Sequence, residues 1–81
     1  MANNKKTYIE NNKSLLEIPS TIFSFIELEI LDLSNNCIFI IPIEIGNLTN
    51  LKILYLNDNQ IKIIPIEIGN LVNLEELYLY N

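Results

Sequence analysis

The chain has 81 residues and a formal net charge of −5, and 49% of its residues are hydrophobic. This length suits one domain, and the apolar content excludes an intrinsically disordered segment. The negative charge repels phosphate groups and argues against binding to nucleic acid or to an anionic membrane surface. It favours partners with basic patches only weakly, because the same charge also keeps a small apolar protein soluble.

Cysteine content and the first residues bear on location. Cys37 is the only cysteine, so the chain cannot form an internal disulfide. Residues Met1–Lys6 lack the apolar core of a secretory signal, and no apolar run approaches the roughly 20 residues that a membrane span needs. We therefore expect a cytoplasmic protein that does not bind membranes.

A 23-residue repeat organises the whole chain. Residues 28–50 and 51–73 are two full copies that are identical at 16 of 23 positions. Residues 1–27 form a degenerate N-terminal repeat or cap, and residues 74–81 are a truncated copy. Self-similarity at this period predicts a single solenoid domain of about three and a half stacked coils.

The first copy departs from the others in its front half. Tyr8 and Glu10 stand where the later copies have leucine, whereas the back half keeps the apolar positions and Pro19. Because Glu10 aligns with the inward-facing Leu33, we expect the first strand to be frayed or out of register. The polar residues Met1–Lys6 together with this copy are expected to cap the solenoid.

The front half of each full copy reads L-x-x-L-x-L-x-x-N-x-I. Leu31 and Leu33 alternate with period two, which predicts a short strand with one face inward. Asn36, and Asn59 in the next copy, are expected to turn the chain off the strand. Their side-chain amides can satisfy backbone groups in their own coil and in the neighbouring one.

The back half of each full copy returns the chain on the opposite side. Pro42 and Pro65 suit the first turn of a short helix or 3₁₀ segment, and Gly46 and Gly69 suit its end. The last copy, LEELYLYN, stops before its turn asparagine and leaves its leucines on an open, apolar strand edge. Such an edge invites pairing, so we expect self-association through this end, a longer protein of which the chain is part, or a minimal or degraded form of such a repeat protein.

These motifs resemble the leucine-rich-repeat proteins, specifically the intracellular 23-residue class of Ras-suppressor-like and Scribble-like proteins. The resemblance covers residues 15–81 and rests on two full copies of the leucine–asparagine pattern followed by I-P-x-x-I-G-N-L. It implies an α/β repeat fold, a curved solenoid with short parallel strands on the concave face and 3₁₀ or irregular connections on the convex face. It also implies a module that binds another protein through its concave strands, often in signalling.

Residues between the inward leucines should face outward on the concave side. These outward positions vary between copies, and they supply the predicted partner-binding residues Asp32, Tyr55, Asn57, Glu76, Tyr78 and Tyr80. Tyrosine offers a large contact area with a polar tip and is enriched at binding hot spots. The alternative interpretation is that tyrosine merely suits strands.

The sequence predicts no enzyme, cofactor or metal site. It contains no histidine, so catalytic triads and the usual zinc ligand sets are excluded. Its two glycines cannot form a glycine-rich phosphate loop, and its carboxylates are spread along the coils. We expect a protein–protein interaction module in intracellular signalling. The alternative is a structural spacer or fragment of a larger leucine-rich-repeat receptor, kinase or effector without a partner of its own.

Overall fold

The computed structural model describes residues 5–80, and in this range four short strands alternate with three 3₁₀ helices. In chain order these are β1 (Thr7–Ile9), η1 (Ser20–Ser24), β2 (Ile30–Asp32), η2 (Ile43–Asn47), β3 (Ile53–Tyr55), η3 (Ile66–Asn70) and β4 (Glu76–Tyr78). Each coil contributes one strand, and each of the first three adds one 3₁₀ helix. The predicted repeat solenoid, with strands on one side and 3₁₀ connections on the other, is confirmed.

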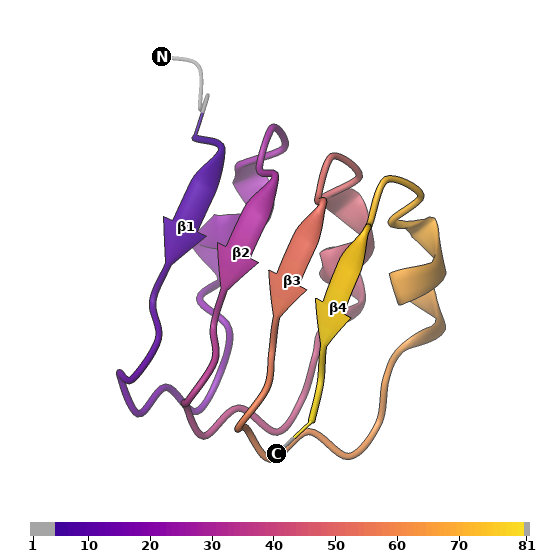
Figure 1. Ribbon diagram of the computed structural model, residues 1–81. Coiled ribbons are helices and arrows are strands. Elements are labelled where there is room, and N and C mark those ends of the chain that lie inside the picture. Colours follow the sequence, from indigo (N-terminus) through magenta and orange to yellow (C-terminus); the bar gives the residue numbers. More distant parts are fainter. Residues whose placement is uncertain (1–4, 81) are drawn as a thin grey trace.

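The four strands form one parallel sheet in the order β1-β2-β3-β4. Each residue pairs with the residue 23 positions later, so that Tyr8 pairs with Leu31, Leu31 with Leu54, and Leu54 with Leu77. Figure 1 shows the strands side by side, with the 3₁₀ helices on the opposite side of the coil. The outer surface of this sheet is called the strand face below.

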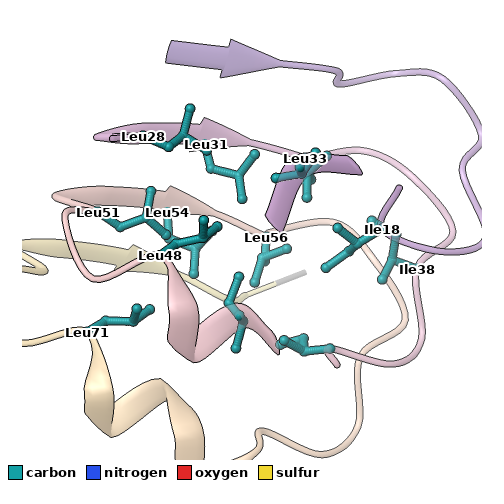
Figure 2. Close-up of a cluster of buried hydrophobic side chains, with 13 residues drawn as sticks. Ile18, Leu28, Leu31, Leu33, Ile38, Leu48, Leu51, Leu54, Leu56 and Leu71 are labelled. Atoms are coloured by element: carbon teal, nitrogen blue, oxygen red, sulfur yellow. The ribbon is translucent and has the colours of Figure 1, made fainter. Parts of the chain in front are cut away.

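The core lies between the strands and the 3₁₀ helices. Leu31 and Leu54 are fully buried, and the 3₁₀ helices contribute the fully buried Ile22 and Ile45 from the other side. Figure 2 shows the buried leucines of successive coils stacked over one another. No single coil encloses its own apolar side chains, so burial depends on stacking.

Side-chain amides connect neighbouring coils. The Nδ2 atom of Asn59 lies 2.9 Å from the carbonyl oxygen of Leu33 in the preceding coil and 3.2 Å from that of Leu56 in its own. Its Oδ1 atom accepts a hydrogen bond from the N–H of Ile38 at 2.9 Å. Asn59 is 6% exposed, so these bonds satisfy backbone groups that water does not reach.

Asn36 makes the same connection one coil earlier. Its Nδ2 atom donates to the carbonyl oxygen of Glu10, and its Oδ1 atom accepts from the N–H groups of Lys13 and Leu15. The left-handed backbone of the turn falls on the preceding residue in each coil, at Asn35 (φ 56°) and Asp58 (φ 59°). Asn and Asp tolerate this region better than most residues. The turn therefore needs two residues, one for the backbone conformation and one for the amide.

The expectation of a frayed or misregistered first strand is wrong. β1 pairs with β2 in the same register as every other pair, and the N–H of Glu10 donates to the carbonyl oxygen of Asp32 at 2.8 Å. Tyr8 takes the place of leucine, packs 5.9 Å from the ring of Phe25, and donates its hydroxyl hydrogen to Glu10 Oε1 at 2.7 Å. The half-buried carboxylate is thereby bonded, and the strand keeps its place.

The prolines and glycines also differ from expectation in detail. Pro42 and Pro65 lie directly before the 3₁₀ helices rather than in their first turn. Gly46 and Gly69 are the second-last residues of those helices, and neither has positive φ. Close packing favours glycine at position 46, because an added Cβ would lie 3.0 Å from Asn70 Nδ2 and 3.1 Å from Glu67 of the next coil.

At the C-terminal side, the leucine of β4 is less covered than its equivalents in β2 and β3. Leu77 is 38% exposed, whereas Leu31 and Leu54 are fully buried. Residues 1–4 and Asn81 lie outside the described residues, and with them part of the predicted N-terminal cap. Self-association through this edge stays a prediction. Within residues 5–80, no helix is long and apolar enough to cross a membrane.

The two glycines provide a matched pair of substitutions. Gly46→Ala should destabilise the fold by about 1–3 kcal/mol, because the methyl group overpacks against the next coil. Gly69→Ala should be neutral or stabilise by up to about 1 kcal/mol, because no atom lies within 4 Å of its added Cβ and alanine restricts the unfolded chain. Urea unfolding measures both. Equal effects at the two positions would contradict this account of packing.

The amide connection can be tested in the same way. Asn59→Ala should lower the free energy of unfolding by roughly 1–3 kcal/mol, because it leaves buried backbone groups unpaired. Asn73→Ala is the control, since Asn73 also bonds across coils, to the carbonyl oxygen of Thr49, but at an exposed position. The control should cost less than about 0.5 kcal/mol, as is usual for surface substitutions. A similar loss in both variants would show that burial does not decide the effect.

Candidate partner-binding face

Three rows of outward positions cross the strand face. One row holds the first residue of each strand, the second holds the last residue of each strand, and the third holds the residue two positions after the strand ends. The rows are Thr7, Ile30, Ile53 and Glu76; Ile9, Asp32, Tyr55 and Tyr78; and Asn11, Ser34, Asn57 and Tyr80. The structure places all six predicted partner-binding residues in these rows. Ser34 differs from the simple alternation, because it is buried and bonds to Asp32.

Three tyrosines form a contiguous cluster at the C-terminal side of this face. The rings of Tyr55 and Tyr78 are stacked, with centroids 4.8 Å apart and planes 5° apart. This distance equals the usual spacing of neighbouring strands, so registered tyrosines stack without bending the backbone. Tyr80 meets Tyr78 edge to face at 6.3 Å and 78° and is 63% exposed. We call these three residues the tyrosine cluster.

Glu76 lies beside the cluster on β4. The hydroxyl of Tyr78 donates to Glu76 Oε1 at 2.5 Å. This hydrogen bond, with smaller contributions from desolvation and from the charge of Glu76, raises the pKa of Tyr78 to about 12. The phenol therefore stays protonated near neutral pH, and its bond holds the carboxylate against the ring that stacks on Tyr55.

Asp32 lies on the other side of the cluster. It occupies the same row as Tyr55 and is its register partner on β2. Its Oδ1 atom accepts from the N–H of Ser34 at 3.0 Å and from the Ser34 hydroxyl at 2.6 Å, and its Oδ2 atom accepts from Asn11 Nδ2 at 3.3 Å. Three donors thus hold this half-buried carboxylate in one orientation, next to an aromatic ring.

The predicted residue Asn57 bonds locally. Its Nδ2 atom donates to Asp58 Oδ2 at 3.0 Å. Its Oδ1 atom is buried and has no hydrogen-bond partner within the described part of the chain. Asn57 therefore lies beside the cluster in the same row as Tyr80, with one polar atom left unsatisfied.

The charge of the strand face is entirely negative. Its three rows contain Asp32 and Glu76 and no lysine or arginine. The nearest ion pairs lie just before the strands, where Glu29 meets Lys6 at 3.6 Å and Lys52 at 3.9 Å. The face thus combines aromatic rings with two fixed carboxylates. Among the described residues, no group of three or more His, Cys, Asp or Glu side chains is placed to hold a metal ion.

A second surface was not predicted from the sequence. Phe39, Ile40 and Ile63 are 53%, 61% and 78% exposed on the segments that lead from the turns to the 3₁₀ helices. They line a depression of about 670 Å³. Four consecutive apolar residues, Ile38–Ile41, were the available sign, because side chains of an extended segment alternate and cannot all face the core. We call this surface the flank.

Comparison with protein-family models identifies the family to which these repeats belong. A leucine-rich-repeat model matches residues 5–61, and a model of two leucine-rich-repeat copies matches residues 49–81. The chain belongs to the leucine-rich-repeat family. A comparison with curated proteins gave no match.

Solved structures of leucine-rich-repeat proteins superpose closely on the chain. A leucine-rich-repeat protein of Leptospira interrogans is 35% identical over 98% of this chain, with a TM-score of 0.93. A plant peptide hormone receptor, RGFR1, solved in complex with RGF2, is 43% identical over 94% of this chain, with a TM-score of 0.84. The chain spans 20% of the first of these proteins and 13% of the second.

The hydrogen bond between the Tyr78 hydroxyl and Glu76 leads to a testable prediction about the pKa of Tyr78. In Glu76→Gln, the pKa of Tyr78 should fall from about 12 towards the ordinary value of 10, because the carboxylate no longer accepts the phenolic hydrogen. Since the folded-state pKa is raised, the stabilising effect of this bond is complete below pH 10 and is lost as the pH rises through about 12. NMR of ¹³C-labelled tyrosine follows each ring separately.

The control for this measurement is Glu10→Gln. It should lower the raised pKa of Tyr8, whose hydroxyl bonds to Glu10, and leave Tyr78 unchanged. A pKa of Tyr78 that stays near 12 in Glu76→Gln would contradict the assigned bond.

Proposed function

We propose that this leucine-rich-repeat module binds a partner protein on its strand face, in intracellular signalling. The observation that carries the proposal is the tyrosine cluster. Stacked rings on the outer side of the sheet contribute nothing to the core, which lies on the other side. Partly exposed aromatic groups of this kind are typical of binding hot spots.

Variation between copies supports a binding role. The inward leucines of the strands repeat, as Leu31, Leu54 and Leu77, because stacking requires them. The residue directly before the turn pair changes from the buried Ser34 to the half-buried Asn57, and the adjacent row changes from aspartate to tyrosine. Positions free of the stacking constraint are those at which a recognition surface can be built.

Preorganisation also favours this face. The rings of Tyr55 and Tyr78 already stack, and bonded neighbours orient Asp32 and Glu76. A partner that binds such a surface loses less free energy to ordering of side chains than one that binds a mobile surface. The plant receptor that the chain resembles was solved in complex with RGF2, which illustrates partner binding in a related solenoid.

The proposed cytoplasmic location rests on sequence. Cys37 is the only cysteine, and the two I-P-x-x-I-G copies resemble the intracellular 23-residue class. The second candidate function is that of a spacer within a larger leucine-rich-repeat protein, with no partner of its own. The observation that favours it is the size of the solved relatives, of which this chain spans a fifth or less.

A retention assay with two double variants separates these functions. The chain is immobilised and exposed to lysate of its source cell, and retained proteins are compared between the native chain, Tyr55→Ala/Tyr78→Ala and the flank variant Phe39→Ser/Ile63→Ser. Circular dichroism checks that each variant is folded. A true partner should bind at least about tenfold more weakly to the tyrosine variant, as expected for loss of hot-spot residues.

The flank variant is the control that distinguishes binding on the strand face from binding on another surface. Retention of the same partner by the native chain and the flank variant, together with loss from the tyrosine variant, supports binding on the strand face. Loss from the flank variant alone moves the binding surface to the flank. If no protein is retained by any form, the spacer function is the better account.

A further inference from the structure

The strand face places two fixed carboxylates next to stacked aromatic rings. Asp32 lies in the row of Tyr55 and is held by three donors, while Glu76 lies on the strand of Tyr78 and is held by its hydroxyl. The two carboxylates belong to β2 and β4. Tyr55 lies on β3 between these strands, and Tyr78 lies on β4 two residues after Glu76. This arrangement specifies which chemical group a ligand should bring.

Several ligand classes fit this face poorly. The three rows of the strand face carry two negative charges and no positive one, and the whole chain has a net charge of −5. A phosphate or an acidic peptide would be repelled by both carboxylates. A purely apolar segment would cover Asp32 and Glu76 without pairing them, and burying an unpaired charge is unfavourable.

A guanidinium group matches each feature of the face. It is planar and stacks on aromatic rings, it is always charged, and its N–H groups form a fork that binds carboxylates. Among residues 5–80, the Tyr78 hydroxyl is the only donor to the Glu76 carboxylate, and it bonds to one of the two oxygens, so both oxygens can still accept from the fork. An ammonium group supplies the charge but neither the planar stacking nor the fork.

We propose that the partner is recognised through an arginine-bearing segment, whose guanidinium groups stack on the tyrosine cluster and pair with Glu76 and Asp32. This inference rests on the proposed binding function of the strand face and names the chemistry of its ligand. β2 and β4 are two strand spacings apart, about 10 Å, and Glu76 lies two residues, about 7 Å along the strand, before the row of Asp32. The long side chains of two arginines at alternate positions of an extended segment can reach both carboxylates at once.

The test is an NMR titration with a defined peptide. The probe is Gly-Ser-Arg-Ser-Arg-Ser-Gly, and its two analogues carry lysine or citrulline in place of arginine. Citrulline keeps the shape of arginine without its charge. The arginine peptide should shift the ring resonances of Tyr55, Tyr78 and Tyr80, and the citrulline peptide should bind at least about tenfold more weakly because the charge-assisted bonds are lost. The lysine peptide should fall between them.

Variants that remove one negative charge locate the contact. Glu76→Gln and Asp32→Asn should each weaken binding of the arginine peptide several-fold. The matched control is Glu44→Gln, which removes the same charge from an exposed position on η2, on the opposite side of the coil. This control should leave binding unchanged, whereas an equal loss in all three variants would reduce the effect to net charge and overturn the proposal.

Other results also decide the matter. Equal binding of the arginine and citrulline peptides, absence of binding by the arginine peptide, or shifts confined to the flank would each overturn the inference. The proposed function is tested separately. A partner lost from Tyr55→Ala/Tyr78→Ala but not displaced by the arginine peptide leaves a binding face with a different ligand chemistry. A partner kept by that variant removes the binding face itself.

Discussion

The buried amides of Asn36 and Asn59 are the contacts on which the rest of the structure depends. Each one is buried and bonds to backbone groups of its own coil and of the coil before it. A coil of 23 residues cannot bury its apolar side chains alone, so it folds only when the next coil stacks in one defined register. The amides supply that register at the turn, and the leucines supply the free energy of burial between turns.

A fixed register has a direct effect on the strand face. Every outward residue lies one strand spacing from its counterpart 23 positions away. Tyr55 and Tyr78 stack for this reason, and Asp32 lies beside Tyr55 for the same reason. The acidic, aromatic character of the surface thus follows from five residues of the three rows, Asp32, Tyr55, Glu76, Tyr78 and Tyr80, without any loop or insertion built for the purpose.

Most of the fold followed from the period and from the alternation of Leu31 and Leu33. What the repeat could not reveal lay where copies differ or where distant atoms meet. Glu10 suggested a misplaced strand because alignment does not show that the Tyr8 hydroxyl bonds to it. The packing role of Gly46 depends on Asn70 in another coil. The three rows of candidate residues were predictable from side-chain alternation. The hydrogen bonds that orient Asp32 and Glu76 could be found only from the structure, and so could the exposed flank at Phe39.

Because register partners are always 23 residues apart, the outward positions of the strand face form a regular two-dimensional array, and the residue number alone gives the position of each residue in it. The remainder after division by 23 gives the row, and the number of whole periods gives the strand, so Ile9, Asp32, Tyr55 and Tyr78 are four consecutive points on one line. An aromatic residue at position 32 would lengthen the stack by one ring, and a charge at position 9 would extend the polar end. Such a surface can be changed one residue at a time, because the leucines that pack the coils together lie on the other side of the sheet and the amides that connect the coils lie at the turns.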